Sequence, residues 1–281
     1  MKIPRDIVIV KSNGENELFD VNKLEASLIQ AGVKQEHANR IIEHVILNIR
    51  PEMKTSEIYS YAHSLLGASR KDCAAKYSLR RAVSELGPTG FPFELFIAEL
   101  FKTQGYETLT DIIVNGKCVE HEMDIIAFNK DKLIMSEAKF HNELGIKSDL
   151  KVVLYIKARF DDLSASTFDF GRLGRKLDEG WIVTNTKFTS TAIKYGVCQN
   201  IKLVGWNYPL KGNLHNMIED AKLHPITTLN TLNKMEKNSL INSGVVLCRE
   251  LEKHQGLMKK MGMKQNKIKL ILDEVEAICN I

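Results

Sequence analysis

One stretch, residues 123–140, constrains this chain most, because it predicts a β-hairpin that carries charge at one end only. It reads MDIIAFNKDKLIMSEAKF, in which two apolar runs of strand-forming residues flank a polar turn. A turn centred in the NKDK segment pairs Phe128 with Leu133, and the same register sets Asp124 directly opposite Glu137. Directly opposed residues share one face of a sheet, with Cβ atoms ~5 Å apart. The hairpin therefore gathers two carboxylates.

Lys139 adds an ammonium group to this pair, because it lies two positions beyond Glu137 and shares its face. Two carboxylates this close repel each other unless a cation lies between them. Clustered carboxylates are hard oxygen ligands that suit Mg²⁺ or Mn²⁺. A surface hairpin with solvated charges is the alternative, whereas the strongly apolar remainder of both strands favours a core hairpin.

The hairpin resembles the core of the PD-(D/E)xK nucleases, in their Mrr-like restriction endonuclease branch. Asp124, a hairpin and then Glu137-Ala138-Lys139 form the signature of that family. Phe93-Glu94 matches the Phe-Glu pair of its opening helix, which here ends at Gly105-Tyr106. One departure is Met123, which stands where many family members have proline.

The resemblance covers residues 90–209 and implies an α/β fold with a mixed β-sheet flanked by helices. It also implies a metal-dependent site in which Asp124, Glu137 and Glu94 hold Mg²⁺. Lys139 would hold and activate the attacking water. Glu99 competes with Glu94 for its role, and Glu94 is preferred because it belongs to the Phe-Glu pair. A helix surface charge is the alternative for Glu94.

The first 87 residues predict a separate small α/β module. A hairpin with an Asn-Gly turn is followed by four segments with helical spacing of apolar residues. Residues 87–90, Gly-Pro-Thr-Gly, then have the composition of a linker. We therefore expect domains at 1–87, 88–210 and 211–281, with few contacts crossing the linker.

This N-terminal module resembles the ATP-cone, the nucleotide-sensing domain at the front of many ribonucleotide reductases. The residues that carry the resemblance are Val10-Lys11-Ser12-Asn13-Gly14, Phe19-Asp20, Lys23-Leu24, Lys54-Thr55-Ser56-Glu57-Ile58, Tyr77 and Arg80. It implies a site for ATP or dATP that includes Lys11, Glu17, Lys23, Thr55, Tyr59 and Arg80. Ser12 departs from the family, which usually has arginine there, and so one phosphate contact is missing. A small structural domain with solvated lysines is the alternative.

Basic residues after the hairpin are candidates for contacts with the DNA backbone. They are Lys147, Lys151, Arg159, Arg172 and Arg175. The first three lie on or beside a helix expected at 148–163, with Ser148 as its N-cap. Positive side chains near a carboxylate–metal site are the groups that a phosphodiester requires. A solvated charged helix face is the alternative for any one of them.

The last segment, from residue 211, predicts helices. Residues 242–245, Asn-Ser-Gly-Val, resemble the hinge of a helix-hairpin-helix, whose backbone N–H groups can hold DNA phosphate. A plain helical cap or a dimerisation element is an equal alternative.

Composition adds limits rather than a function. The net charge of +4 over 281 residues is too small to indicate nucleic-acid binding by itself, so local patches would have to bind DNA. The five cysteines form no CxxC pair and the histidines no zinc pattern. No apolar run reaches the length of a membrane span. We therefore expect a soluble, cytoplasmic protein.

Together, these patterns predict a Mg²⁺-dependent DNA endonuclease regulated by ATP or dATP, acting as a homodimer or as a nucleotide-dependent oligomer. The chain lacks the G-x-x-x-x-G-K loop, so the nucleotide would be bound without hydrolysis. One alternative is a catalytically silent, nucleotide-responsive DNA-binding regulator. Another is a regulator of nucleotide metabolism that acts on a protein partner.

Overall fold

The N-terminal module is a two-stranded hairpin covered by four helices. The computed structural model describes residues 7–11, 14–67 and 71–279. The elements of this module are β1 (Val8–Val10), β2 (Asn16–Leu18), α1 (Val21–Gln30), α2 (Gln35–Asn48), α3 (Thr55–Gly67) and α4 (Lys71–Ser84). Asp20 caps α1 by accepting a hydrogen bond from the Asn22 backbone N–H. Ser12 and Asn13 of the predicted turn lie outside the described residues.

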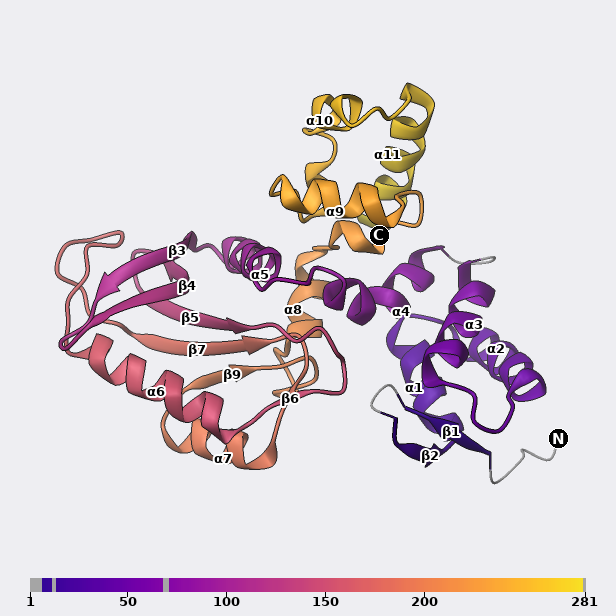
Figure 1. The fold of residues 1–281 in the computed structure, drawn as a ribbon, viewed down its shortest axis with the longest axis horizontal. Helices are drawn as coiled ribbons and strands as arrows, with labels where there is room; N and C mark the ends of the chain where they lie inside the picture. The colour runs from indigo at the N-terminus through magenta and orange to yellow at the C-terminus, as the bar shows by residue number, and fades with distance from the viewer. Residues whose placement is uncertain (1–6, 12–13, 68–70, 280–281) are drawn as a thin grey trace.

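The central module is a five-stranded mixed sheet, as predicted (Figure 1). Its strands are β3 (Glu107–Asn115), β4 (Glu120–Phe128), β5 (Leu133–Lys139), β7 (Glu179–Thr184) and β9 (Lys202–Val204), in the order β3-β4-β5-β7-β9. The first three strands are antiparallel, and β5, β7 and β9 run parallel. Phe128 pairs with Leu133, which confirms the predicted hairpin register.

Helices cover both faces of this sheet, because alternate strand residues point to opposite sides. On one face lie α6 (Leu150–Ser164) and α7 (Ser190–Cys198), and on the other α5 (Phe91–Thr103) and α8 (Leu214–Ala221). Two short parallel strands, β6 (Lys147–Ser148) and β8 (Lys187–Phe188), form a second sheet beside them. Ser148 therefore does not cap α6; Asp149 does, by accepting from the Val152 backbone N–H.

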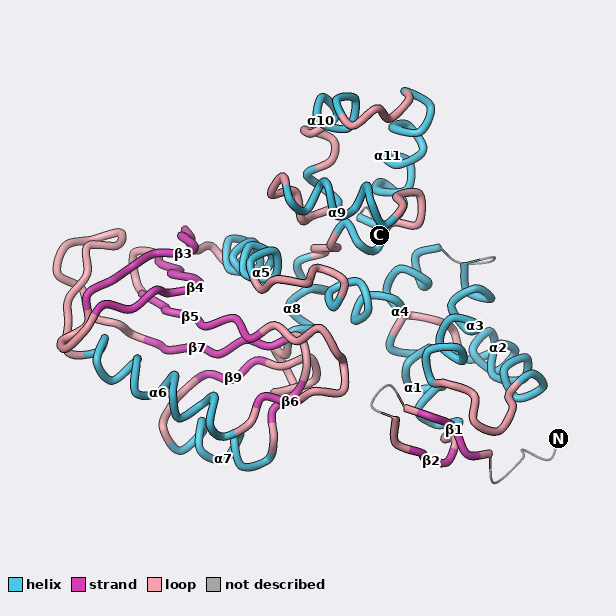
Figure 2. Tube along the Cα trace, viewed as in Figure 1, coloured by secondary structure: helices cyan, strands magenta, loops and turns pink. Residues whose placement is uncertain are grey.

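The C-terminal segment consists of helices joined by loops, as Figure 2 shows. After α8 it contains η1 (Ile226–Thr228), α9 (Lys234–Asn242), η2 (Cys248–Glu250), α10 (Gln255–Lys260) and α11 (Gln265–Cys279). The predicted hinge at 242–245 ends α9 with Gly244 at a φ of +79°. Among the helices of the described residues, none is long and apolar enough to cross a bilayer.

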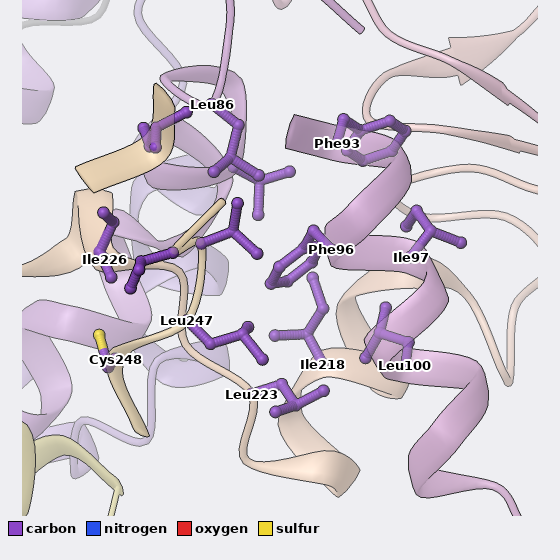
Figure 3. Close-up of a cluster of buried hydrophobic side chains, with 14 of the residues drawn as sticks. Leu86, Phe93, Phe96, Ile97, Leu100, Ile218, Leu223, Ile226, Leu247 and Cys248 are labelled. Atoms are coloured by element: carbon purple, nitrogen blue, oxygen red, sulfur yellow. The ribbon is translucent and has the colours of Figure 1, made fainter. Parts of the chain in front are cut away.

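One of three hydrophobic clusters contains residues of all three segments. Leu86, which follows α4, belongs to the same buried cluster as Phe96 of α5 and Leu247 of the C-terminal segment (Figure 3). In addition, the Thr227 hydroxyl donates to the Ala82 carbonyl at 2.6 Å. The expectation that few contacts cross residues 87–90 was therefore wrong. The domain boundaries themselves stay predictions.

Candidate active site

The β4–β5 hairpin positions the two carboxylates that define the candidate site. Ile125 and Ser136 form the last paired position of the ladder, and Asp124 and Glu137 are the next residues along each strand. The strands separate here, and Asp124 Oδ2 accepts a hydrogen bond from the Ala138 backbone N–H at 2.7 Å. This bond fixes the Asp124 carboxylate beside the strand that carries Glu137.

Arg159 of α6 contacts the Glu137 carboxylate. Its Nη1 atom donates to Glu137 Oε2 at 2.7 Å, and both side chains are largely buried, with exposed fractions of 12% and 14%. The same guanidinium also donates to the backbone carbonyl of Glu122. We had expected Arg159 to contact DNA, but the structure places it inside the acidic site, where it neutralises a carboxylate.

Glu94 joins the cluster from the first turn of α5. Partial burial, followed by the negative charges of Asp124 and Asp111, raises its pKa to about 8. Its competitor Glu99 lies elsewhere, since its carboxylate binds Lys102 and Arg249. The preference for Glu94 over Glu99 therefore agrees with their placement.

Asp111 is a member of this cluster that the sequence reasoning missed. It lies in β3 between two residues paired with Ile125 and Met123, which places it beside Asp124 on the neighbouring strand. Its backbone has a φ of +53°, uncommon for a residue other than glycine, and its side chain hydrogen-bonds to Glu94. An acid that interrupts the run Thr-Leu-Thr-Asp-Ile-Ile-Val was the available signal.

The electrostatics of the site show an excess of negative charge. Burial and the Asp124 charge raise the pKa of Glu137 to about 7, against the opposing effects of Arg159 and Lys139. Burial also raises the pKa of Asp124. Lys139 is exposed at the end of β5. Two cations thus oppose four carboxylates, and a further cation would relieve the repulsion.

The donor chemistry of this cluster fits a hard divalent cation such as Mg²⁺, because all of its donors are carboxylate oxygens. The coordination geometry is not preformed: within residues 7–11, 14–67 and 71–279, no three acidic, histidine or cysteine side chains stand close enough to hold a metal. The Glu137 carboxylate instead forms an ion pair with Arg159. A metal would therefore have to compete with this ion pair.

The predicted DNA contacts divide into exposed and buried residues. Lys147, Lys151 and Arg172 are exposed and can reach a ligand. Arg175 is only 3% exposed and donates to the backbone carbonyls of Asn129 and Phe170. This buried position makes Arg175 a structural residue that holds the turn after β4, which corrects its assignment as a DNA contact.

The predicted nucleotide-binding residues also separate into two groups. Thr55, Tyr59 and Arg80 line one cavity of about 640 Å³. Lys11 instead forms an ion pair with Glu15 at 2.5 Å. Lys23 pairs with Glu17 at 3.3 Å, and none of these four residues is among those that line the cavity.

Comparisons with known proteins place this site in a recognised domain. Residues 88–207 match the family model described as "Restriction endonuclease", of the Mrr type. Residues 224–279 match the model described as "AF1548-like, C-terminal". The chain thus contains a restriction-endonuclease-like domain, which suggests a DNA nuclease and agrees with the Mrr-like resemblance of the sequence.

Two similar proteins extend over most of the chain. An uncharacterized protein of Archaeoglobus fulgidus is 34% identical over 183 residues, which are 65% of this chain and 99% of that protein. A crystal structure of the protein of unknown function AF1548 is 33% identical, with a TM-score of 0.55, and the match covers 67% of this chain and 97% of that one. The MspJI restriction endonuclease, solved with an oligonucleotide, is a weaker match at 16% identity and a TM-score of 0.32, covering 75% of this chain and 44% of that one.

Proposed function

This chain belongs to the AF1548-like family and contains a restriction-endonuclease-like domain, and on that premise we propose that it is a Mg²⁺-dependent DNA endonuclease. The observation that carries the proposal is the gathering of Glu94, Asp111, Asp124 and Glu137 beside Lys139. A structural sheet gains nothing from such a cluster, because burial and mutual repulsion make its ionised form costly.

Each side chain has a role that follows from its position. Asp124 and Glu137 would hold the metal, with Glu94 completing the shell directly or through water. The metal would supply a Lewis acid that offsets charge on the phosphate. Lys139, exposed at the end of β5, would hold the attacking water and donate to the phosphate oxygens. Lys147, Lys151 and Arg172 would position the DNA backbone.

Arg159 holds Glu137 in place through their ion pair. Because its guanidinium also binds a backbone carbonyl, it remains anchored to β4 if Glu137 turns away toward a cation. The ion pair also favours the alternative of a catalytically silent DNA-binding protein, in which Arg159 would fill the place of the metal permanently. A cleavage assay separates these two cases.

We further propose that the N-terminal module binds ATP or dATP and alters cleavage or assembly without hydrolysing the nucleotide. This proposal rests on the ATP-cone resemblance of the sequence of this module, which folds as a hairpin with four helices. The cavity lined by Thr55, Tyr59 and Arg80 is large enough for one nucleotide. A ligand that only binds can still shift an equilibrium through its different affinity for two states.

The test is cleavage of supercoiled, relaxed and linear DNA by the purified chain in Mg²⁺ or in EDTA, each with and without ATP or dATP. The proposal predicts nicks or breaks in Mg²⁺ only. Intact DNA under every Mg²⁺ and Mn²⁺ condition, with DNA binding retained, would instead support the silent DNA-binding protein.

A further inference from the structure

The cavity of about 640 Å³ lies between modules rather than within one. Thr55 and Arg80 line it from the N-terminal module, Asn142 and Leu144 from the loop after β5, and Trp206 from the end of the central sheet. Figure 1 shows that the loop leading to β6 faces the N-terminal module. Any ligand in this cavity would touch the sensing module and the nuclease module together.

One wall of the cavity is aromatic and suited to a flat ring. Tyr59 and Tyr77 stack with ring centroids 5.0 Å apart and an angle of 7° between their planes. Trp206 adds a third aromatic side chain from the central module. Aromatic side chains in a cavity are usual contacts of a bound base, and here Arg81 also lies over the Tyr59 ring, 5.8 Å from its centroid.

Positive charge gathers around Arg80, which lines the cavity together with Arg81, while Lys147 and Lys187 lie outside the lining. Lys147 of β6 and Lys187 of β8 are directly paired across the short parallel sheet. Partial desolvation and then the charges of Arg80, Lys147 and Lys23 lower the pKa of Lys187. Arg80, Lys147 and Lys23, from three other elements of the chain, therefore lie within electrostatic range of Lys187.

Little in the described part of the chain balances this charge. Lys23 pairs with Glu17, but Arg80, Lys147 and Lys187 form no ion pair there. Arg80 donates to the Leu144 carbonyl at 3.2 Å, while its buried Nε atom has no hydrogen-bond partner among the described residues. The carboxylates that line the cavity are Glu85, which is paired with Arg81, and Glu143. Clustered cations without counter-charge form a binding site for a polyanion.

We propose that one nucleoside polyphosphate binds across both modules, with its base on the Tyr59 and Tyr77 wall and its phosphates at Arg80, Lys147 and Lys187. The proposal rests on the nucleotide-binding part of the proposed function, and it adds two lysines of the nuclease module to the site. It also moves Lys147 from a DNA contact to a nucleotide contact. A DNA duplex is too wide to enter a cavity of this size, which favours the smaller ligand.

The same contacts connect this site to the candidate active site. Ser148, next to Lys147, lies 3.0 Å from His141 Nε2, and His141 follows the candidate catalytic Lys139 by two residues. Arg80 holds the Leu144 carbonyl in the intervening loop. Phosphates bound at Arg80 and Lys147 would therefore fix the middle and the far end of the loop that follows Lys139. Nucleotide binding would order or shift this loop and so change cleavage.

Calorimetric titration of the full chain with ATP, dATP, AMP and adenosine tests the proposal, using Lys187→Glu, Lys11→Glu and the control Lys269→Glu. Lys269 lies exposed on α11, so its variant makes the same charge change far from the cavity. We expect Lys187→Glu to weaken ATP binding by roughly tenfold or more and AMP binding by less, since a charge-assisted phosphate contact becomes repulsive. Lys11→Glu and Lys269→Glu should bind ATP as the unchanged protein does. Circular dichroism and thermal melting check that each variant is folded.

Each other outcome rejects a distinct part of the account. Weakening by Lys11→Glu but not by Lys187→Glu would place the nucleotide in the N-terminal module alone, and would overturn this inference while nucleotide sensing stands. Loss of DNA affinity in Lys187→Glu with ATP affinity unchanged would make these lysines DNA contacts and would also overturn it. No heat from any nucleotide with the folded, unchanged protein would end both the inference and the sensing proposal. DNA cleavage is measured separately on the same samples, so the nuclease proposal is judged independently.

Discussion

The Arg159 guanidinium donates to Glu137 Oε2 at 2.7 Å, so the candidate site of this nuclease-like domain contains its own counter-charge. This cation comes from α6, on the face of the sheet opposite α5, and it meets Glu137 just beyond the last paired position of β4 and β5. The pair explains how four neighbouring carboxylates can coexist in a folded protein. It also makes Arg159 a control element for the ionisation of the site.

We predict that Arg159→Gln moves the acid limb of the cleavage profile to higher pH. Arg159 lowers the pKa of both Glu137 and Asp124, so its removal raises both, and Glu137, whose pKa is already about 7, becomes mostly protonated at neutral pH. Cleavage at pH 7 should fall by about tenfold and recover toward pH 9, because each unit of pKa shift changes the ionised fraction about tenfold. Cleavage rates from pH 6 to 9 measure this, with Arg40→Gln, at an exposed position on α2, as a control. A higher rate at pH 7 in Arg159→Gln would instead mean that the ion pair inhibits the enzyme.

The raised pKa of Glu94 predicts that the free energy of unfolding depends on pH in metal-free buffer. Its pKa rises from an ordinary 4.5 to about 8 in the folded chain, so the folded state binds the proton more tightly than the unfolded state. The resulting stabilisation is complete below about pH 4.5 and is lost as the pH rises to about 8. Glu94→Gln should therefore unfold with a smaller pH slope. At pH 8.5 it should be ~1–2 kcal/mol more stable than the unchanged protein, a figure reduced to allow for solvent screening. Urea unfolding at several pH values measures this; equal slopes would contradict it.

Substitution of Gly180 tests how α6 packs on the sheet that supports the site. A Cβ atom on Gly180 of β7 would lie 2.4 Å from the Phe160 ring, so Gly180→Ala forces this ring to move. We expect a loss of ~1–3 kcal/mol in unfolding free energy. Gly256→Ala in α10 meets no atom within 4 Å and should be neutral or stabilising by up to ~1 kcal/mol. Thermal and urea unfolding compare the two, and equal stability of both variants would refute the packing described here.

The sequence alone predicted the strands that carry the site, because their signal is local. The apolar runs around Asn129–Lys132 set the register of β4 and β5, and the pairing of Phe128 with Leu133 follows from the turn. Asp111 and Arg159 escaped this reasoning because their roles depend on long-range placement. Asp111 reaches the site through pairing of β3 with β4, and Arg159 through the packing of α6 against the sheet.

The mutual packing of the modules was likewise hidden from the sequence. Gly-Pro-Thr-Gly has the composition of a free linker, yet a Cβ atom on Gly87 would lie 2.4 Å from the Asn142 side chain. Leu86 just before it is fully buried against α5 and the C-terminal segment. A composition rule describes local backbone preference, whereas the burial of Leu86 depends on side chains more than a hundred residues away.

A Lys139 variant should lose DNA cleavage but keep metal binding. Lys139→Ala removes the ammonium group at the end of β5 but no carboxylate, so we expect cleavage to fall by about 10²–10³-fold while Mn²⁺ still binds. Calorimetry with Mn²⁺ and a plasmid assay measure the two properties on one sample. The exposed Lys269→Ala serves as the control for loss of one positive charge. Loss of Mn²⁺ binding together with cleavage would show that Lys139 acts on the metal site rather than on the water.

The most direct test of the central claim is plasmid cleavage by the unchanged chain, Asp124→Asn, Glu137→Gln and the control Glu120→Gln, in Mg²⁺ and in EDTA. Glu120 is an exposed carboxylate at the start of β4, four residues before Asp124, and it pairs with Asn115 of β3. The account predicts Mg²⁺-dependent cleavage by the unchanged chain and by Glu120→Gln. Asp124→Asn and Glu137→Gln should lose about 10³-fold or more while binding DNA as well or better, since a repulsive charge is removed. Full cleavage by Glu137→Gln would contradict the assignment of this acidic cluster as the active site.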